Sequence, residues 1–350
     1  MNAPAATGPS VVQAVARGRR RSASRRRAVV LTLAVLVAAG FAVTLMFGQT
    51  FYPPRDVVRV ILGEQVPGAS FTVGRLRLPR TVLAVVAGFS FGLAGVTFQT
   101  MLRNPLASPD IIGISWGASA AAAIAIVSLS LGGTQVSILA IVSALAVALL
   151  VYTLAFRDGV VGTRLILIGI GISAILESIT SYVLSRAAEW DLQEALRWLT
   201  GSLNGTTWEQ ALPALVALVV LTPVLLAKSR DLSALRLGDD TASALGVRVE
   251  RTRVTLIVAA VGLIAFATAA AGPIAFVAFL SGPIAARLVG TGGSLLVPAG
   301  FVGALLVLVA DFAGQFAFDV RYPVGVVTGV LGAPYLVYLI VRTHRAGGSL

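Results

Sequence analysis

Long apolar runs separated by short polar stretches dominate the chain. Ten of these runs are about as long as a helix that crosses a bilayer, which takes about 20 residues. They cover residues 28–48, 80–102, 110–130, 134–156, 164–186, 208–228, 253–272, 274–290, 294–314 and 323–342. The pattern predicts an all-α polytopic membrane protein with about ten transmembrane helices.

The division between the seventh and eighth runs depends on one dipeptide. Residues 253–290 are apolar almost throughout, and a single helix of that length would overshoot the bilayer. Gly272-Pro273 lies inside this stretch, and proline interrupts the hydrogen bonding of a helix. We therefore expect two spans here, joined by a tight turn.

The composition excludes several classes of protein. With 57% hydrophobic and 12% charged residues, the chain has more apolar surface than one soluble core can hide. It has no cysteine, and its one histidine, His344, lies near the C-terminus, so we expect no catalytic residue, no metal site and no cofactor. The one lysine, Lys228, follows Ala227, whereas a Walker loop needs lysine after glycine, so the chain is not expected to hydrolyse ATP itself.

The net charge of +12 comes almost entirely from arginine. Most arginines lie between the apolar runs, as the positive-inside rule requires, and no basic face with interleaved aromatic residues points to nucleic acid. An even number of spans with basic residues at both ends predicts that both termini are cytoplasmic.

This topology divides the chain into three parts. Residues 1–27 close with seven arginines and are expected to form a disordered, basic cytoplasmic leader. Residues 28–342 form the transmembrane domain, and residues 343–350 form a cytoplasmic tail. A secretory signal peptide is the competing interpretation of the start, but the run 28–48 is longer than a typical signal-peptide core.

The first outer loop, about residues 49–79, contradicts the usual charge bias. It contains Arg55, Arg59, Arg75 and Arg77, and Arg80 follows at the start of the second span. An acidic partner or an anionic substrate on the outside would explain these charges. Arginines that anchor a helix end to lipid phosphates are the alternative.

Two connecting segments read as short helices. Ala188–Gly205 is amphipathic and tryptophan-rich, which predicts a helix along the outer membrane surface. In the longest inner loop, residues 228–253, the apolar positions fit two short helices separated by Gly238, the second ending at Gly246. Exposed helices of this kind suit docking into a groove on a partner.

Four segments, in order along the chain, resemble one known family. They are Arg77–Arg80 (RLPR), Gln99–Ala118 (QTMLRNPLASPDIIGISWGA), Gly238–Val247 (GDDTASALGV) and Pro323–Leu339 (PVGVVTGVLGAPYLVYL). They are similar to the FecCD/BtuC-type permeases, the membrane subunits of ABC importers for iron-siderophores, haem and vitamin B12. The likeness covers nearly the whole chain from about residue 50.

The resemblance implies a BtuC-like, type II ABC importer bundle without an ATPase site of its own, located in the cytoplasmic membrane of a bacterium. Its partners would be a second permease subunit, identical or not, two ATP-binding cassette ATPase subunits and an extracytoplasmic substrate-binding protein. An iron-siderophore complex is the expected substrate, because this is the commonest role in the family. A motor-independent secondary transporter or channel is the alternative. It is disfavoured because candidate ionisable groups at membrane depth are few: Glu177 and Asp311 are each expected to be a packing partner rather than a proton relay.

The resemblance also implies three sets of site residues. Docking of the binding protein maps to Arg77 and Arg80, with Arg321 as a substitute where some members have arginine and this chain has Gln315. The inner gate maps to Gly162, Thr163 and Arg164, although Thr163 as an ordinary helix cap fits equally well. Coupling to the ATPase maps to the following residues: Leu237, Gly238, Asp239, Asp240, Ala242, Leu245, Gly246 and Val247. Ser281-Gly282-Pro283 replaces the family's common Val-Pro-His, so no site is carried over there.

Overall fold

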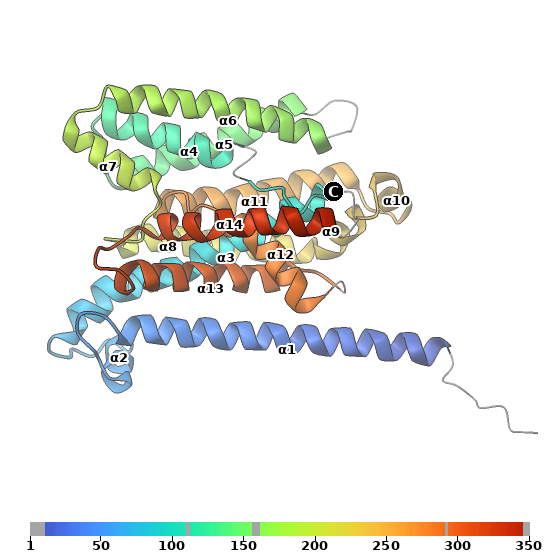
Figure 1. The fold of residues 1–350 in the computed structure, drawn as a ribbon, viewed down its shortest axis with the longest axis horizontal. Helices are drawn as coiled ribbons and strands as arrows, with labels where there is room; N and C mark the ends of the chain where they lie inside the picture. Colours follow the sequence, from blue (N-terminus) through green and yellow to red (C-terminus); the bar gives the residue numbers. More distant parts are fainter. Residues whose placement is uncertain (1–10, 110–112, 156–161, 291–292, 346–350) are drawn as a thin grey trace, which may run out of the picture.

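The computed structural model describes residues 11–109, 113–155, 162–290 and 293–345, and this part of the chain is a bundle of helices without strands (Figure 1). Most of the long helices lie roughly along one axis. In chain order the elements are α1 Val11–Met46, α2 Pro54–Ile61, the π-helical η1 Ser70–Arg77, α3 Leu78–Met101, α4 Ile114–Ala123, the π-helical η2 Ile124–Ser128, α5 Thr134–Ala155, α6 Gly162–Ser185, α7 Glu189–Leu199, α8 Trp208–Ala227, α9 Ser229–Leu235, α10 Asp239–Ala244, α11 Val249–Ala271, α12 Val277–Val289, α13 Leu296–Phe316 and α14 Val324–Arg345.

The ten predicted spans correspond to ten apolar helical segments of the described residues. Seven are long and apolar enough to cross a membrane: α1, η1 with α3, α5, α6, α8, α11 and α13. Three are shorter, namely Ile114–Ser128, Val277–Val289 and Val324–Tyr338. The predicted break at Gly272-Pro273 is confirmed, since α11 ends at Ala271 and α12 begins only at Val277.

Helix α3 lies at the centre of the bundle. It packs against α13, α11, α12 and α8, and most of its residues are buried. A side chain at Gly92 would overlap the backbone of Ala299 in α13, and one at Gly95 would overlap Ala278 in α12. The glycines of α3 therefore allow α12 and α13 to approach it closely.

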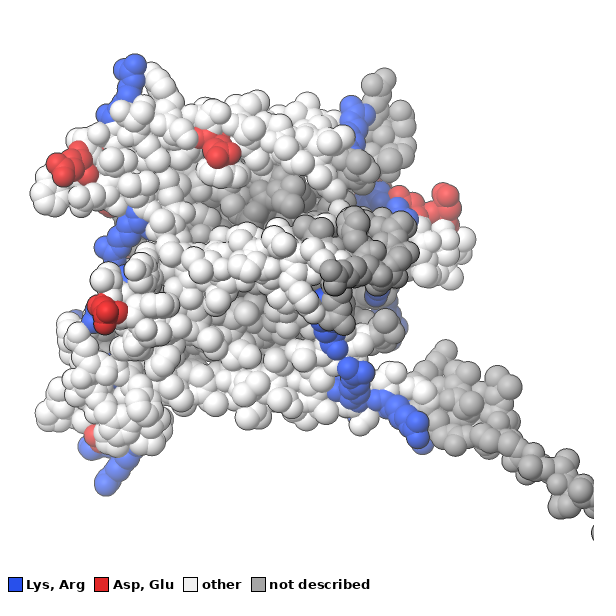
Figure 2. All heavy atoms as spheres, viewed as in Figure 1, with Lys and Arg blue, Asp and Glu red and all other residues white. Residues whose placement is uncertain are grey.

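The two ends of the bundle carry different short helices (Figure 1). Helices α2 and α7 lie at one end, which we call the α7 end, and α9 and α10 lie at the opposite end, which we call the α10 end. Charged side chains gather at both ends, while the surface between them is largely uncharged (Figure 2). This distribution matches a bundle whose middle is surrounded by lipid.

Both chain ends differ from the expectation. Residues 1–10 and 346–350 lie outside the described residues, but α1 begins at Val11, so the basic segment up to residue 27 is helical rather than disordered. Arginine and alanine favour helix, and extending a helix that the apolar span has already begun costs little. The last span likewise continues to Arg345, three residues into the expected tail.

Candidate functional site

A cavity of about 830 Å³ lies between α4, α6, α14 and the segment that joins α11 to α12. Most of its walls are apolar, with Trp116, Phe276 and Phe279 as the largest side chains. A volume of this size, with mostly apolar walls and a few polar groups, is typical of small-molecule sites. We call it the central cavity.

Few polar side chains face the central cavity. Ser115 and Ser119 come from α4, and Glu177, Thr180 and Ser181 come from α6. Glu177 is exposed and forms no hydrogen bond or ion pair with another described residue, so its expected role as a packing partner within this chain is wrong. Glu177 of α6 instead forms part of the lining of the central cavity.

The broken stretch between α11 and α12 forms one wall of the central cavity. Pro273, Ile274, Ala275 and Phe276 line it, and Phe276 adopts a left-handed backbone with φ of 65°. A side chain at Gly332 of α14 would overlap the Phe276 ring, so the ring lies directly against the α14 backbone. The short α12 therefore follows from an irregular segment inside the bundle, which only protein or cavity surroundings tolerate.

The two helices beside the cavity, α6 and α14, are poorly covered by the rest of the chain. Leu167, Ile175 and Tyr182 of α6 and Val330 and Val337 of α14 are 59–68% exposed. Gly171 of α6 and Gly329 of α14 have no neighbouring atom within 4 Å of an added Cβ. These small residues do not serve close packing inside the chain, in contrast to those of α3.

At the α7 end, Arg80 is held inside the protein. Its guanidinium donates to both carboxylate oxygens of Asp311 in α13, at 2.9 Å and 2.7 Å, and to the side-chain oxygen of Asn204. Gln315 donates to the same carboxylate at 2.9 Å. The side chains of Arg80 and Asp311 are 15% and 3% exposed, so this is a buried, bidentate ion pair. Asp311 is thus confirmed as a packing partner, and Arg80 is not a free outward charge.

Arg77 is also engaged within the chain. It donates to the backbone oxygens of Leu45, Met46 and Thr50, where α1 ends, and it lies 5.1 Å from the ring centre of Tyr52. It therefore caps the C-terminus of α1, where a cation interacts favourably with the helix dipole.

Other arginines at this end are more accessible. Arg321 is exposed and forms no hydrogen bond or ion pair with described residues. Arg59 forms an ion pair with Glu64 at 2.6 Å, and this hydrogen bond raises the pKa of Arg59 above its ordinary value. Of the three predicted docking residues, Arg321 alone is exposed and without a partner among the described residues, and the docking role of all three stays a prediction.

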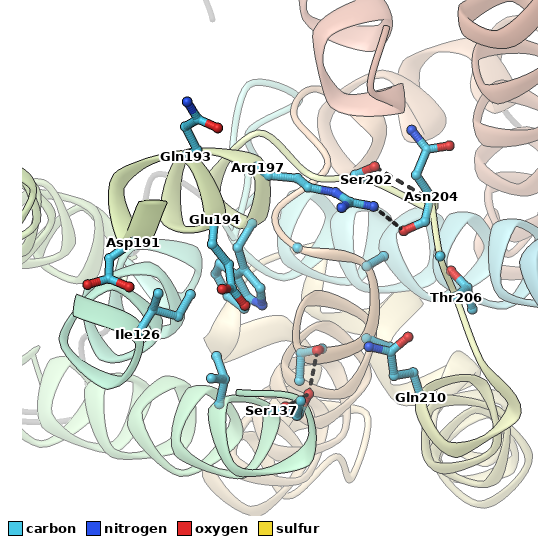
Figure 3. A pocket seen from close by; sticks show the side chains of 18 of the residues that line it. Ile126, Ser137, Asp191, Gln193, Glu194, Arg197, Ser202, Asn204, Thr206 and Gln210 are labelled. Atoms are coloured by element: carbon cyan, nitrogen blue, oxygen red, sulfur yellow. Dashed lines mark hydrogen bonds between the residues drawn. The ribbon is translucent and has the colours of Figure 1, made fainter. Parts of the chain in front are cut away.

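A second, polar cavity of about 700 Å³ lies against α7 (Figure 3). Arg197 reaches across its rim and donates to the backbone oxygen of Asn204 at 2.9 Å, and Glu194 points into it. Asn204 therefore accepts from both arginines: its backbone oxygen accepts from Arg197, and its side-chain oxygen accepts from Arg80. Helix α7, which the sequence predicted, contributes to both cavities: Leu199 at its end lines the central cavity, and several of its earlier residues line the polar one.

At the α10 end, the predicted inner loop folds as two short helices, α9 and α10, separated at Gly238 and ended at Gly246. Ala242 is fully buried, whereas Leu237 and Leu245 are each 64% exposed. Asp239 accepts from the buried Arg253 of α11 at 2.7 Å. Among the other predicted coupling residues, Asp240 is exposed, and Val247 packs against the main core. The structure thus brings the predicted residues together as a small projecting unit tied to α11.

The predicted gate lies in the first turn of α6. Gly162 and Thr163 are helical, Arg164 is exposed, and residues 156–161 before them lie outside the described residues. The assignment as a gate stays a prediction.

The sequence did not predict the residues that line the central cavity, because its walls come from segments that are distant in sequence. Gly272-Pro273, which predicted a break between two spans, was the one local indication of the irregular segment in its wall.

A polytopic bundle with an apolar cavity between incompletely covered helices, and with short helices projecting at one end, defines a membrane transport subunit of the permease class. Comparison with known proteins agrees: residues 35–342 match the FecCD transport family. The chain is 38% identical over 322 residues to the achromobactin transport system permease protein CbrC of Dickeya dadantii, covering 91% of each chain. It is 38% identical over 307 residues to the ferric enterobactin transport system permease protein FepG of Escherichia coli, covering 87% of this chain and 90% of FepG.

A solved structure shares the fold. It is described as an inward-facing conformation of a metal-chelate type ABC transporter, and it superposes with a TM-score of 0.81 at 26% identity, over 90% of this chain and 99% of the other. The chain belongs to the FecCD transport family. The expected all-helical permease bundle is confirmed, and the chain is a multi-pass membrane protein of the ABC transporter class.

Proposed function

We propose that this chain forms half of the translocation path of an importer that moves an iron-siderophore complex across the cytoplasmic membrane, using ATP hydrolysed by separate subunits. The central cavity carries this proposal. It is apolar, it lies between helices of one subunit, and it is bordered by the uncovered faces of α6 and α14.

A second permease subunit, identical or homologous, would cover those faces. Gly171 and Gly329 support this, because exposed small residues at helix surfaces allow another helix to approach closely, whereas lipid makes no such demand. Two facing cavities would then form one larger path. The carboxylate of Glu177 would lie near the junction.

The α10 end would receive the two ATPase subunits. Leu237 and Leu245 expose apolar side chains on the projecting unit, as expected of helices that fill a groove on a partner. The ion pair between Asp239 and Arg253 joins α10 to α11, whose other end leads into the wall of the central cavity. ATP-driven movement of the docked subunits would thus reach the path as a rigid-body shift. In this arrangement both termini would lie in the cytoplasm.

At the α7 end, an extracytoplasmic binding protein would deliver the substrate. Arg321 is proposed to contact it directly. Arg77 and Arg80 would act by holding α1, α3 and α13 in place beneath the docking surface, because direct docking would require each to give up its partners in the chain.

The proposed substrate class follows from relatives and from the donor set. FepG is named for ferric enterobactin, a chelated iron. Among the described residues, no group of three or more His, Cys, Asp or Glu could hold a metal ion. A chain of this kind offers bare iron few ligands, so the cargo is proposed to travel as an intact chelate.

Deletion of the gene followed by growth under iron limitation, with defined siderophores supplied one at a time, tests the substrate. We expect growth to fail with one siderophore class and to recover with the wild-type gene. Equal growth with every siderophore would refute the iron-siderophore assignment.

Purification tests the machinery separately. The tagged chain, extracted in mild detergent, should retain an ATPase subunit, and reconstituted vesicles should accumulate substrate only when ATP and that subunit are present. Accumulation by the purified chain alone would support the motor-independent alternative instead.

A further inference from the structure

A third cavity, of about 360 Å³, lies at the α10 end between the last turn of α3, the loop after it, α9 and α12. Two arginines line it, Arg103 after α3 and Arg236 between α9 and α10, together with the polar side chains of Gln99, Thr100 and Asn104. No carboxylate is among the described residues that line it. We call it the arginine cavity.

The backbone at Arg103 is held in a conformation that favours glycine. Arg103 has φ of 53° and follows Leu102, the C-cap residue of α3, in a Schellman motif. Its N–H donates to the backbone oxygen of Thr100 at 3.3 Å, and the N–H of Asn104 donates to that of Gln99 at 3.1 Å. The same motif ends α10, where the equivalent residue is Gly246 with φ of 84°. A side chain at this position costs stability, so the presence of arginine rather than glycine after α3 requires a reason other than backbone geometry.

The side chains of Arg103 and Arg236 are both exposed, and neither forms a hydrogen bond or ion pair with another described residue. The Arg103 guanidinium lies beside the start of α10, with Nη1 3.6 Å from the position of a Cβ on Gly238. Arg236 is two residues before Gly238. Two guanidinium groups that have no partner among the described residues therefore lie where the projecting unit begins, and the proposed function assigns this unit to the ATPase.

One hydrogen bond connects the lining of the arginine cavity to that of the central cavity. Gln99, which is 7% exposed, donates to the backbone oxygen of Phe279 in α12 at 2.9 Å. Phe279 lines the central cavity, and Gly282 and Pro283 of the same helix line the arginine cavity. Helix α12 is thus a wall shared by both cavities.

We propose that the arginine cavity is a second docking site for the ATPase subunit, which inserts a carboxylate side chain between Arg103 and Arg236. This inference rests on the proposed function, since it names the chemistry of one contact of that partner. A carboxylate matches guanidinium geometry, and two cations with no acidic residue among the described residues of the cavity lining favour an acidic occupant. A protein side chain is favoured over a lipid phosphate because α9 and α10, which flank the site, project at the end of the bundle, beyond its largely uncharged middle (Figures 1 and 2). The contact connects the ATPase to α12 as well as to α11.

The test uses the transporter assembled from this chain, its second permease subunit and its ATPase subunits, in nanodiscs. Arg103→Gly removes the charge but suits the backbone, so the variant should unfold no more easily than the wild type on heating. Its ATPase subunits should bind roughly tenfold more weakly at low salt, as should those of Arg236→Gln. The difference from wild type should shrink as salt screens the contact. Arg103→Lys should restore part of the affinity, and Arg27→Gln, which removes an exposed charge from α1, should bind like wild type.

Each outcome decides the proposal. Wild-type affinity in both Arg103→Gly and Arg236→Gln, while the wild-type chain binds its ATPase, would overturn the arginine cavity as a docking site and leave the proposed function standing. Failure of the wild-type chain to bind any ATPase subunit would overturn both. A defect that appears in nanodiscs with anionic phosphatidylglycerol, but vanishes in pure phosphatidylcholine, would assign the cavity to lipid phosphate and refute the protein contact.

Discussion

Replacing Asp311 by asparagine keeps the shape of the side chain and removes the charge that holds Arg80. Arg80 and Asp311 are 15% and 3% exposed, so the change leaves a nearly buried guanidinium without its counter-charge. Removing one partner of a buried pair costs about 3–5 kcal/mol. We expect the lower limit, about 3 kcal/mol, because Arg80 retains its hydrogen bond to Asn204 and some contact with water.

The free energy of unfolding, measured by titration with SDS in mixed micelles, checks this value. A double variant, Arg80→Met with Asp311→Leu, supplies the control, because it removes both charges together and should lie within about 1 kcal/mol of wild type. Two results would refute the view that this ion pair stabilises the packing of α3 against α13. One is a loss of less than about 1 kcal/mol in the free energy of unfolding of Asp311→Asn, and the other is a double variant no more stable than the single one. If Asp311→Asn is as stable as wild type but no longer docks the binding protein, the result would instead support a direct docking role for Arg80.

Three further predictions concern other parts of the bundle. Gly95→Ala should prevent folding or lower thermal stability strongly, because the new methyl group would overlap the backbone of Ala278, whereas Gly171→Ala should fold normally; equal stability of the two on size-exclusion chromatography after heating would contradict the packing of α3. Gly238→Val should separate ATP hydrolysis from uptake while the bundle stays folded, since valine fits poorly at φ of 105°, and uptake at the wild-type rate would count against the role of α10. Arg321→Glu should weaken docking of an acidic binding protein, and more strongly at low salt; unchanged affinity in a binding titration would remove Arg321 from the docking surface.

The sequence alone determined the class of protein, the number of spans and the positions of the short helices α7, α9 and α10. These features depend on local pattern: a run of about 20 apolar residues must be helical to satisfy its backbone in lipid, and Gly272-Pro273 must interrupt it. The same holds for α9 and α10, whose boundaries at Gly238 and Gly246 follow from glycine at helix ends.

Only the tertiary structure decided what the charged and cavity-lining residues do. The arginines of the RLPR segment looked outward in sequence, yet Arg80 meets an aspartate 231 positions later and Arg77 meets the end of α1. The walls of the central cavity come from α4, α6, α12 and α14, which no local pattern connects. Apolar periodicity specifies which segments enter the membrane, but every span there is apolar, so partner choice among helices depends on close packing and paired charges between residues far apart in the chain.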